Sequence, residues 1–151
     1  MRRFTPILLA GLVTGALDIV SAFASYATQG FTPDGILKYI ASGLVGPTAM
    51  KGGAEMVALG LLCHLGLTTA MAAIFLFAAQ RFSALVARPW FWGLVYGFLT
   101  WVGMVYVVVP LSGAPGWKLP QGWAIVSGLM AHFFYVGVPI AHITQWGLRK
   151  N

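Results

Sequence analysis

Four long apolar stretches, separated by shorter polar segments, dominate the pattern along the chain. They cover residues 6–27, 54–79, 89–111 and 122–146. A helix of roughly 20 mostly apolar residues spans the hydrocarbon core of a bilayer, and it satisfies its own backbone hydrogen bonds there. The pattern therefore predicts an all-α membrane protein, with a bundle of four transmembrane helices in a single membrane domain over residues 1–151.

A fifth helix is predicted in the long connection between the first two spans. Thr32, Pro33 and Asp34 are, in order, an N-cap residue, an N1 proline and a first-turn acid. Apolar residues then recur at helical spacing as far as Val45. We expect a short amphipathic helix over 33–45 that lies in the outer membrane interface.

The composition supports a lipid environment. Hydrophobic residues make up 59% of the chain and charged residues only 8%, whereas an ordinary soluble domain has about 25% charged residues. Three acidic and nine basic residues cannot cover a globule in water, so a soluble enzyme and a nucleic-acid partner are excluded. The expected partner is the lipid bilayer, and glycine-rich helix faces would also allow a homo-oligomer or a larger membrane complex. Because the chain has one cysteine, Cys63, it has no internal disulfide.

The basic residues predict the orientation. Six lie in the N-terminal segment, the 80–89 loop and the C-terminal end, and three lie in the opposite loops (Arg2, Arg3, Arg81, Arg88, Arg149 and Lys150, against Lys38, Lys51 and Lys118). Lys and Arg accumulate on the cytoplasmic side, so both termini are expected in the cytoplasm. The start of the chain is similar to a signal peptide, but Asp18 interrupts its apolar part, so we expect a retained first helix.

The first two spans resemble the last two. The segment 11–18 matches 93–100 at five of eight positions, and 60–64 matches 128–132 at three of five. Two tandem copies of one helical hairpin would explain these matches, with a pseudo-two-fold axis along the membrane normal. Alternatively, the matches reflect only the abundance of Gly and Leu in membrane helices.

Ionisable residues near the membrane midplane are the candidate site. Asp18, His64 and His132 each lie within roughly 3 Å of the midplane of their span, and Thr100 lies at the same level. An ionisable group at that depth costs about 2.5 kcal/mol or more, and such groups are mostly functional. A proton relay could use Asp18 with a histidine, extended by His142 and Glu55.

Other interpretations of the same residues remain open. His64 and His132 could be the axial ligands of a non-covalently bound haem b, or they could hold a transition metal together with Asp18. A purely structural Asp–His hydrogen bond between helices is the third possibility. No hydrolase or nucleotide-binding motif is present, so an enzyme is the less favoured class. The leading hypothesis is a proton-linked protein that binds or transports a small solute. The alternatives are a haem electron-transfer protein and an accessory membrane subunit.

Several short segments resemble those of small four-span bacterial inner-membrane proteins, some distantly similar to the YagU-like group. These segments are the helix around Asp18 and residues 40–44, 60–64, 107–112, 132 and 139–141. The resemblance implies a bacterial inner-membrane location. It assigns no activity and no catalytic residue.

Overall fold

Every regular element of the protein is a helix in the computed structural model, which describes residues 4–150. The long segments are α1 (Phe4–Ala27), α3 (Ala54–Arg81), the run α5, η2 and α6 (Pro89–Gly103, Met104–Val108 and Val109–Leu111) and the run α7, η3 and α8 (Trp123–Ala131, His132–Gly137 and Val138–Arg149). The short elements are α2 (Pro33–Val45), η1 (Pro47–Lys51) and α4 (Ala84–Ala87). Arg2 and Arg3, which contribute to the predicted orientation, lie outside the described residues.

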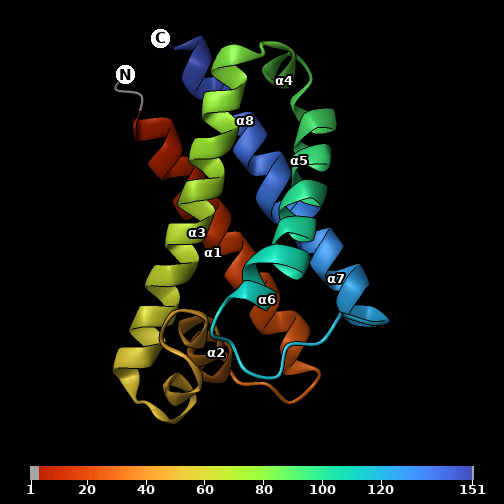
Figure 1. Cartoon of the computed structure of the whole chain (residues 1–151). Coiled ribbons are helices and arrows are strands. Elements are labelled where there is room, and N and C mark those ends of the chain that lie inside the picture. The colour runs from red at the N-terminus through yellow and green to blue at the C-terminus, as the bar shows by residue number, and fades with distance from the viewer. Residues whose placement is uncertain (1–3, 151) are drawn as a thin grey trace.

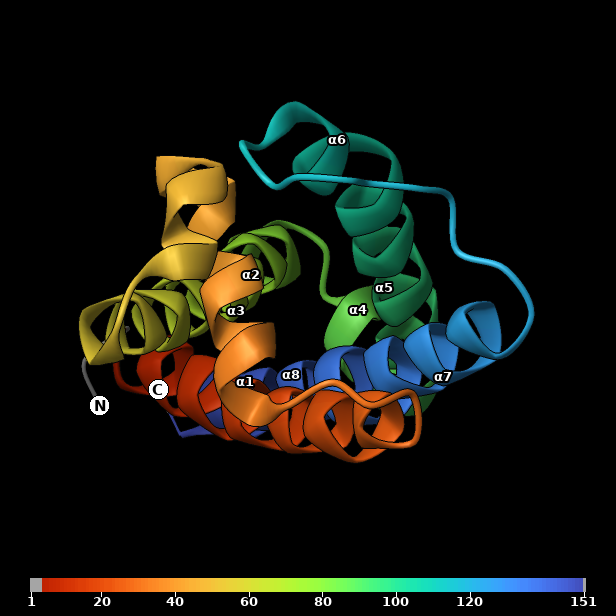
Figure 2. The same cartoon turned by 90° about the horizontal axis from the view of Figure 1, so that it is seen from below.

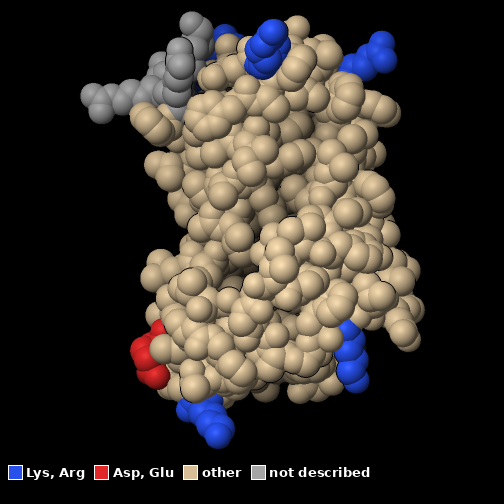
Figure 3. Space-filling view, viewed as in Figure 1, with Lys and Arg blue, Asp and Glu red and all other residues tan. Residues whose placement is uncertain are grey.

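Four segments within residues 4–150 are long and apolar enough to cross a membrane: Phe4–Ala27, Ala54–Arg81, Pro89–Leu111 and Trp123–Arg149. Figure 1 shows them as roughly parallel rods, with α2 at one end of the bundle and residues 4 and 150 at the other, here called the α2 end and the terminal end. Charged side chains occupy these two ends on the face seen in Figure 3, and the band between them carries none. The predicted all-α chain with four apolar helices of spanning length is therefore confirmed.

Two of the four segments change their helical hydrogen bonding partway along. Residues Met104–Val108 and His132–Gly137 form π-helical turns, directly before the short α6 and the long α8. Pro110 and Pro139 stand in the first turns of those helices. A proline has no N–H, and its ring crowds the carbonyl one turn back. The helix therefore changes from α-helical to wider π-helical hydrogen bonding before each proline.

The first span packs between the second and the fourth. Helix α1 contacts α3 along one side and the α7–η3–α8 run along another, while α5 packs against η3 and α8. Figures 1 and 2 show α1 beside the α7–α8 run in both views. The buried core near the terminal end combines small and large apolar residues from α1, α3 and the fourth span: Ala10, Ala72, Phe75, Ala79, Val136, Ile140 and Ala141.

Glycines allow the backbones of neighbouring helices to approach closely. A Cβ atom added at Gly11 would lie 2.6 Å from Cα of Thr69, and one at Gly97 would lie 2.3 Å from the carbonyl oxygen of His132. A Cβ at Gly60 would overlap the carbonyl of Leu37 on α2. Small residues at such crossings are how membrane helices gain packing without a hydrophobic driving force.

Helix α2 begins as its sequence predicts. The Thr32 hydroxyl accepts a hydrogen bond from the backbone N–H of Gly35 at 3.3 Å, and Pro33 stands at the first helical position. Hydrogen bonds from Thr32 and from Lys38, the latter at 3.3 Å, hold the pKa of the Asp34 carboxyl below its usual value. The buried face of α2 packs on the first half of α3, and the N–H of Gly113 donates to the carbonyl of Gly43. This backbone hydrogen bond holds the connection over 112–122 against α2.

Substituting Gly97 with alanine should destabilise the bundle, because the new methyl group would meet the backbone of His132. Overpacking of this kind costs about 1–3 kcal/mol. A methyl group at Gly103, on the same span, would meet only open space, so Gly103→Ala is the matched control. Unfolding in mixed detergent micelles, followed by circular dichroism, should show a loss for Gly97→Ala alone. Equal effects of the two substitutions would contradict the close approach.

Candidate functional site

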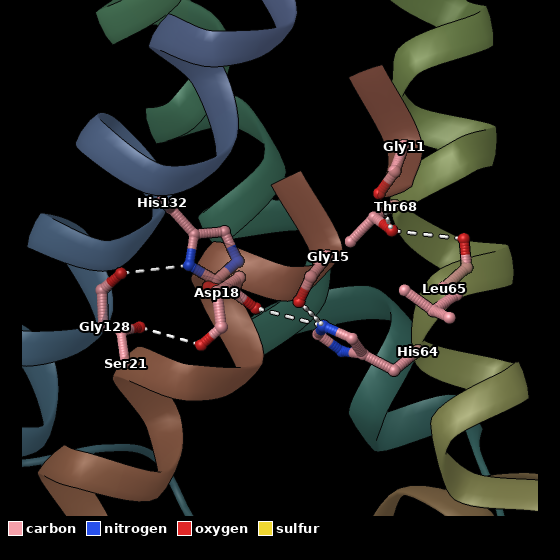
Figure 4. A network of polar contacts seen from close by, with 9 residues as sticks. All are labelled: Gly11, Gly15, Asp18, Ser21, His64, Leu65, Thr68, Gly128 and His132. Atoms are coloured by element: carbon pink, nitrogen blue, oxygen red, sulfur yellow. Dashed lines mark hydrogen bonds and ion pairs between the residues drawn. The ribbon is translucent and has the colours of Figure 1, made fainter. Parts of the chain in front are cut away.

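The structure brings together three of the residues that the sequence singles out. Asp18 lies on α1, His64 on α3, and His132 at the first position of η3. Figure 4 shows the Asp18 side chain between the two imidazole rings. The Asp18 Oδ2 atom is 3.8 Å from Nε2 of His64, and Asp18 also interacts electrostatically with His132. The cluster therefore joins three of the four spans near the middle of the bundle.

His64 is fixed by the backbone of α1. Its Nε2 lies 3.0 Å from the carbonyl oxygen of Gly15, and because a carbonyl can only accept, Nε2 carries the hydrogen. One turn further along α3, the Thr68 hydroxyl donates to the carbonyl of Gly11 at 2.9 Å. The paired glycines thus expose two successive carbonyls to two side chains of α3 (Figure 4). This arrangement explains His64 largely as a residue that holds α1 against α3.

His132 is oriented by its own helix. Its Nδ1 lies 3.0 Å from the carbonyl of Gly128, one turn earlier, so Nδ1 carries the hydrogen of the neutral ring. The lone pair of Nε2 then remains free to accept a hydrogen bond. Because α5 approaches at Gly97, the His132 backbone is held tightly while its ring projects toward α1.

Asp18 has no hydrogen bond to its carboxylate within residues 4–150. The 3.8 Å separation from His64 exceeds hydrogen-bond length, so the pair is an electrostatic contact only. The Asp18 side chain is 18% exposed. That exposure opens into a cavity.

A cavity of about 600 Å³ lies between α1 and the α7–η3 segment. Asp18 and His132 lie toward its inner side, and Tyr26, Thr28 and Trp123 lie toward the α2 end. The lining residues are Asp18, Ser21, Ala22, Ala24, Ser25, Tyr26, Thr28, Trp123, Ser127, Gly128, Met130, Ala131, His132 and Tyr135. No lysine or arginine is among the described residues that line it. Its volume falls in the range of small-molecule sites.

A polar stripe on α1 accompanies this cavity. Thr14, Asp18, Ser21, Ser25 and Thr28 are spaced four or three residues apart, so they share one helix face. The Ser21 hydroxyl donates to the carbonyl of Asp18 in the same helix, and the Thr28 hydroxyl, just after α1, donates to the carbonyl of Ser25. The hydroxyls of Thr14 and Ser25 are buried and have no hydrogen-bond partner within residues 4–150. Buried polar atoms are almost always paired, and Ser25 is among the residues that line the cavity, so its unpaired hydroxyl indicates a place for water or another polar species.

The other three predicted site residues do not join the cluster. Thr100 is buried, but its hydroxyl donates to the carbonyl of Gly97 in its own helix at 2.9 Å. Glu55 is exposed in the first turn of α3, where its Oε1 accepts a hydrogen bond from the N–H of Gly53 at 2.7 Å. His142 lies ten residues beyond His132, with its ring edge against Trp90 at 5.0 Å between centroids.

The geometry does not fit a haem held by His64 and His132. Two axial imidazoles must face each other across the iron. Here α1 packs against both α3 and η3, and Asp18 occupies the space between the two rings. Within residues 4–150, no three His, Cys, Asp or Glu side chains are arranged to hold a metal ion.

Some residues that line the cavity were not predicted from the sequence. The hydroxyls of Ser21 and Ser127 and the ring of Trp123 gave no signal, because serine and tryptophan are ordinary residues of membrane helices and interfaces. The spacing of Thr14, Asp18, Ser21, Ser25 and Thr28 was a usable signal for the polar stripe. The cavity itself depends on how α1 packs against the α7–η3 segment.

The four apolar helices indicate a multi-pass helical membrane protein, and Asp18 and His132 line a cavity between α1 and the α7–η3 segment. Comparison with protein-family models, with curated proteins and with solved structures gave no significant match to the chain.

Replacing Thr68 with valine should weaken the contact between α1 and α3, because valine keeps the shape and removes the donor to Gly11. Hydrogen bonds between membrane helices contribute on average about 0.6 kcal/mol. Thr100→Val is the matched control, since the Thr100 hydroxyl bonds only within its own helix. Steric-trap or detergent unfolding measures the difference. A larger loss for Thr100→Val would contradict this assignment.

Proposed function

We propose that the protein binds and transports a small solute in a proton-linked manner across a bacterial inner membrane. The observation that carries this proposal is the position of Asp18 and His132 at the inner part of a cavity that extends toward the α2 end. A carboxylate in a low-dielectric setting without a direct hydrogen bond is costly. A bound proton or cation would offset that cost.

The geometry supports this function over a purely structural role. A structural staple would use a direct hydrogen bond between Asp18 and a histidine, and the nearest such nitrogen is 3.8 Å away. The packing between α1 and α3 is supplied instead by His64 and Thr68 through backbone carbonyls. Asp18 is therefore available to exchange protons with the cavity and with the adjacent imidazoles. The titratable groups around it are His64 on α3 and His132 and Tyr135 on η3.

A route toward the terminal end would need a conformational change. Thr14 lies one turn inward of Asp18 and is fully buried, and helix packing closes the space beyond it. The π-helical turn η3 begins at His132 and ends just before Pro139. Such turns are common at functional sites, and we assign η3 as the hinge about which α8 would move.

The proposed orientation places the α2 end outside and the terminal end in the cytoplasm, because the basic residues favour the terminal end. Helix α2 would then lie in the outer interface. The two hairpins would be tandem copies, which is supported by equivalent packing: Gly11 and Gly15 face α3, and Gly93 and Gly97 face η3 and α8.

The lipid bilayer is the proposed surrounding, with a second copy or another membrane subunit as a further partner. The third span supports such a partner, because only 11% of its most apolar stretch is buried, against 28–33% in the other spans. Lipid or another helix must cover the remainder. No observation suggests a nucleic-acid partner.

Proton flux tests the central proposal. We expect purified protein in liposomes that contain a pH-sensitive dye to show proton uptake under an imposed potential. Asp18→Asn should lower the initial rate about tenfold or more, because the amide cannot carry the proton. Asp34→Asn, which removes an exposed acid of α2, is the matched control.

Two results would count against this function. A wild-type rate no higher than that of empty liposomes would exclude a proton path. An Asp18→Asn variant with lowered stability and an unchanged rate would assign Asp18 to packing, as expected for an accessory subunit.

The orientation has its own test in intact cells. In a Cys63→Ser background, Lys118→Cys should react with a membrane-impermeant maleimide added outside. Arg149→Cys should react only after the membrane is permeabilised. The two positions lie at opposite ends of the fourth span and its preceding loop, so the reverse labelling pattern would invert the proposed topology.

A further inference from the structure

The cavity offers hydrogen-bond acceptors and lacks cationic donors. The Asp18 carboxylate can only accept, and the free Nε2 of neutral His132 accepts as well, because Nδ1–H is engaged by Gly128. The Ser21 hydroxyl has already donated its hydrogen to a backbone carbonyl, so only its lone pairs remain. The buried Ser25 hydroxyl has no partner within the described residues. Near Asp18 and His132, a ligand that brings several N–H donors and a positive charge suits these acceptors.

We propose that the cavity binds an organic primary ammonium ion, an inference that rests on the proposed function and specifies its solute. The three N–H groups of the ammonium lie between Asp18 and His132. Its apolar body extends along α1 and α7 toward Tyr26 and Trp123. Most of the lining in that direction is apolar or aromatic, which suits the apolar body of such a ligand.

Other ligand classes fit the cavity less well. An anion would be repelled by Asp18 and would find no lysine or arginine in the described lining. A neutral solute would leave the carboxylate without a counter-charge in a low-dielectric site. A bare metal ion would leave most of a 600 Å³ space unfilled, and no three-ligand group is present within residues 4–150.

This ligand explains the link to protons. The Asp18 carboxylate with its neighbouring imidazoles can hold either one proton or one ammonium ion, and both leave the same net charge in the membrane. When the cluster is protonated, loading the ammonium from the α2 end releases that proton, and protonation expels the ammonium. Without an ammonium ion the cluster carries protons alone, which is the flux that the liposome assay measures. The exchange needs no covalent step.

Binding of phenethylamine to the purified protein tests the inference. Equilibrium dialysis with the radiolabelled amine should show saturable binding, and a pH indicator in weak buffer should show proton release on binding. Removing one partner of a charged hydrogen bond costs about 1.5–3 kcal/mol, so Asp18→Asn should weaken binding by about tenfold or more. Asp34→Asn should bind as the wild type does.

Two probe molecules and a second variant test the chemistry further. The alcohol 2-phenylethanol lacks the charge, and phenethyltrimethylammonium keeps the charge and lacks the N–H donors. Both should compete more weakly than phenethylamine. Ser21→Ala, which removes hydroxyl lone pairs one helical turn from Asp18 at the cavity wall, should weaken phenethylamine binding severalfold, and it keeps the test valid if Asp18→Asn fails to fold.

The outcomes separate this inference from the function on which it rests. Equal competition by the alcohol would show a nonspecific apolar pocket and overturn the ammonium site. Proton flux that depends on Asp18, without saturable binding of phenethylamine, would overturn the ammonium site and leave the proton path. Loss of both would overturn both.

Discussion

Close approach of helix backbones at glycines is the constraint on which the rest of this structure depends. Lipid gives apolar side chains no reason to cluster, so helices associate through packing and hydrogen bonds. At Gly11 and Gly15 the backbone of α1 comes near enough to α3 for two of its carbonyls to accept side-chain hydrogen bonds. This contact fixes the rotation of α1 about its axis. That rotation in turn places Asp18 between His64 of α3 and His132 of η3.

The same packing explains why the charged cluster can exist in an apolar bundle. His64 is occupied by the carbonyl of Gly15, and His132 by the carbonyl of Gly128, so each ring keeps a fixed direction without using Asp18. The carboxylate then faces a cavity that reaches toward the α2 end. In a low-dielectric surrounding an unpaired carboxylate is unfavourable, so the site prefers to hold a bound cation. The proposed proton and ammonium exchange follows from that single energetic preference.

The sequence was informative where a signal is local. Apolar runs of spanning length predict membrane helices, and the order of Thr32, Pro33 and Asp34 predicts the start of α2. The depth of Asp18, His64 and His132 along their spans predicted a shared level, because helical rise converts residue number into height. Depth alone also suggested Thr100, whose hydroxyl instead bonds within its own helix. Whether a side chain at this depth joins the Asp18 cluster depends on the rotation of its helix about the helix axis. Packing against neighbouring helices determines that rotation.

The sequence by itself determined the class of protein, a helical membrane protein. A chain with so few charges suits a lipid environment, and helices satisfy their own backbone hydrogen bonds there. It also determined which ionisable residues lie deep in the spans. Tertiary structure alone decided that α1 lies between α3 and the fourth span, which places Asp18 between two imidazoles and does not suit a haem. It also decided where the cavity lies. The physical reason is that the separation of two helices depends on side chains from both, and no single segment of sequence contains that information.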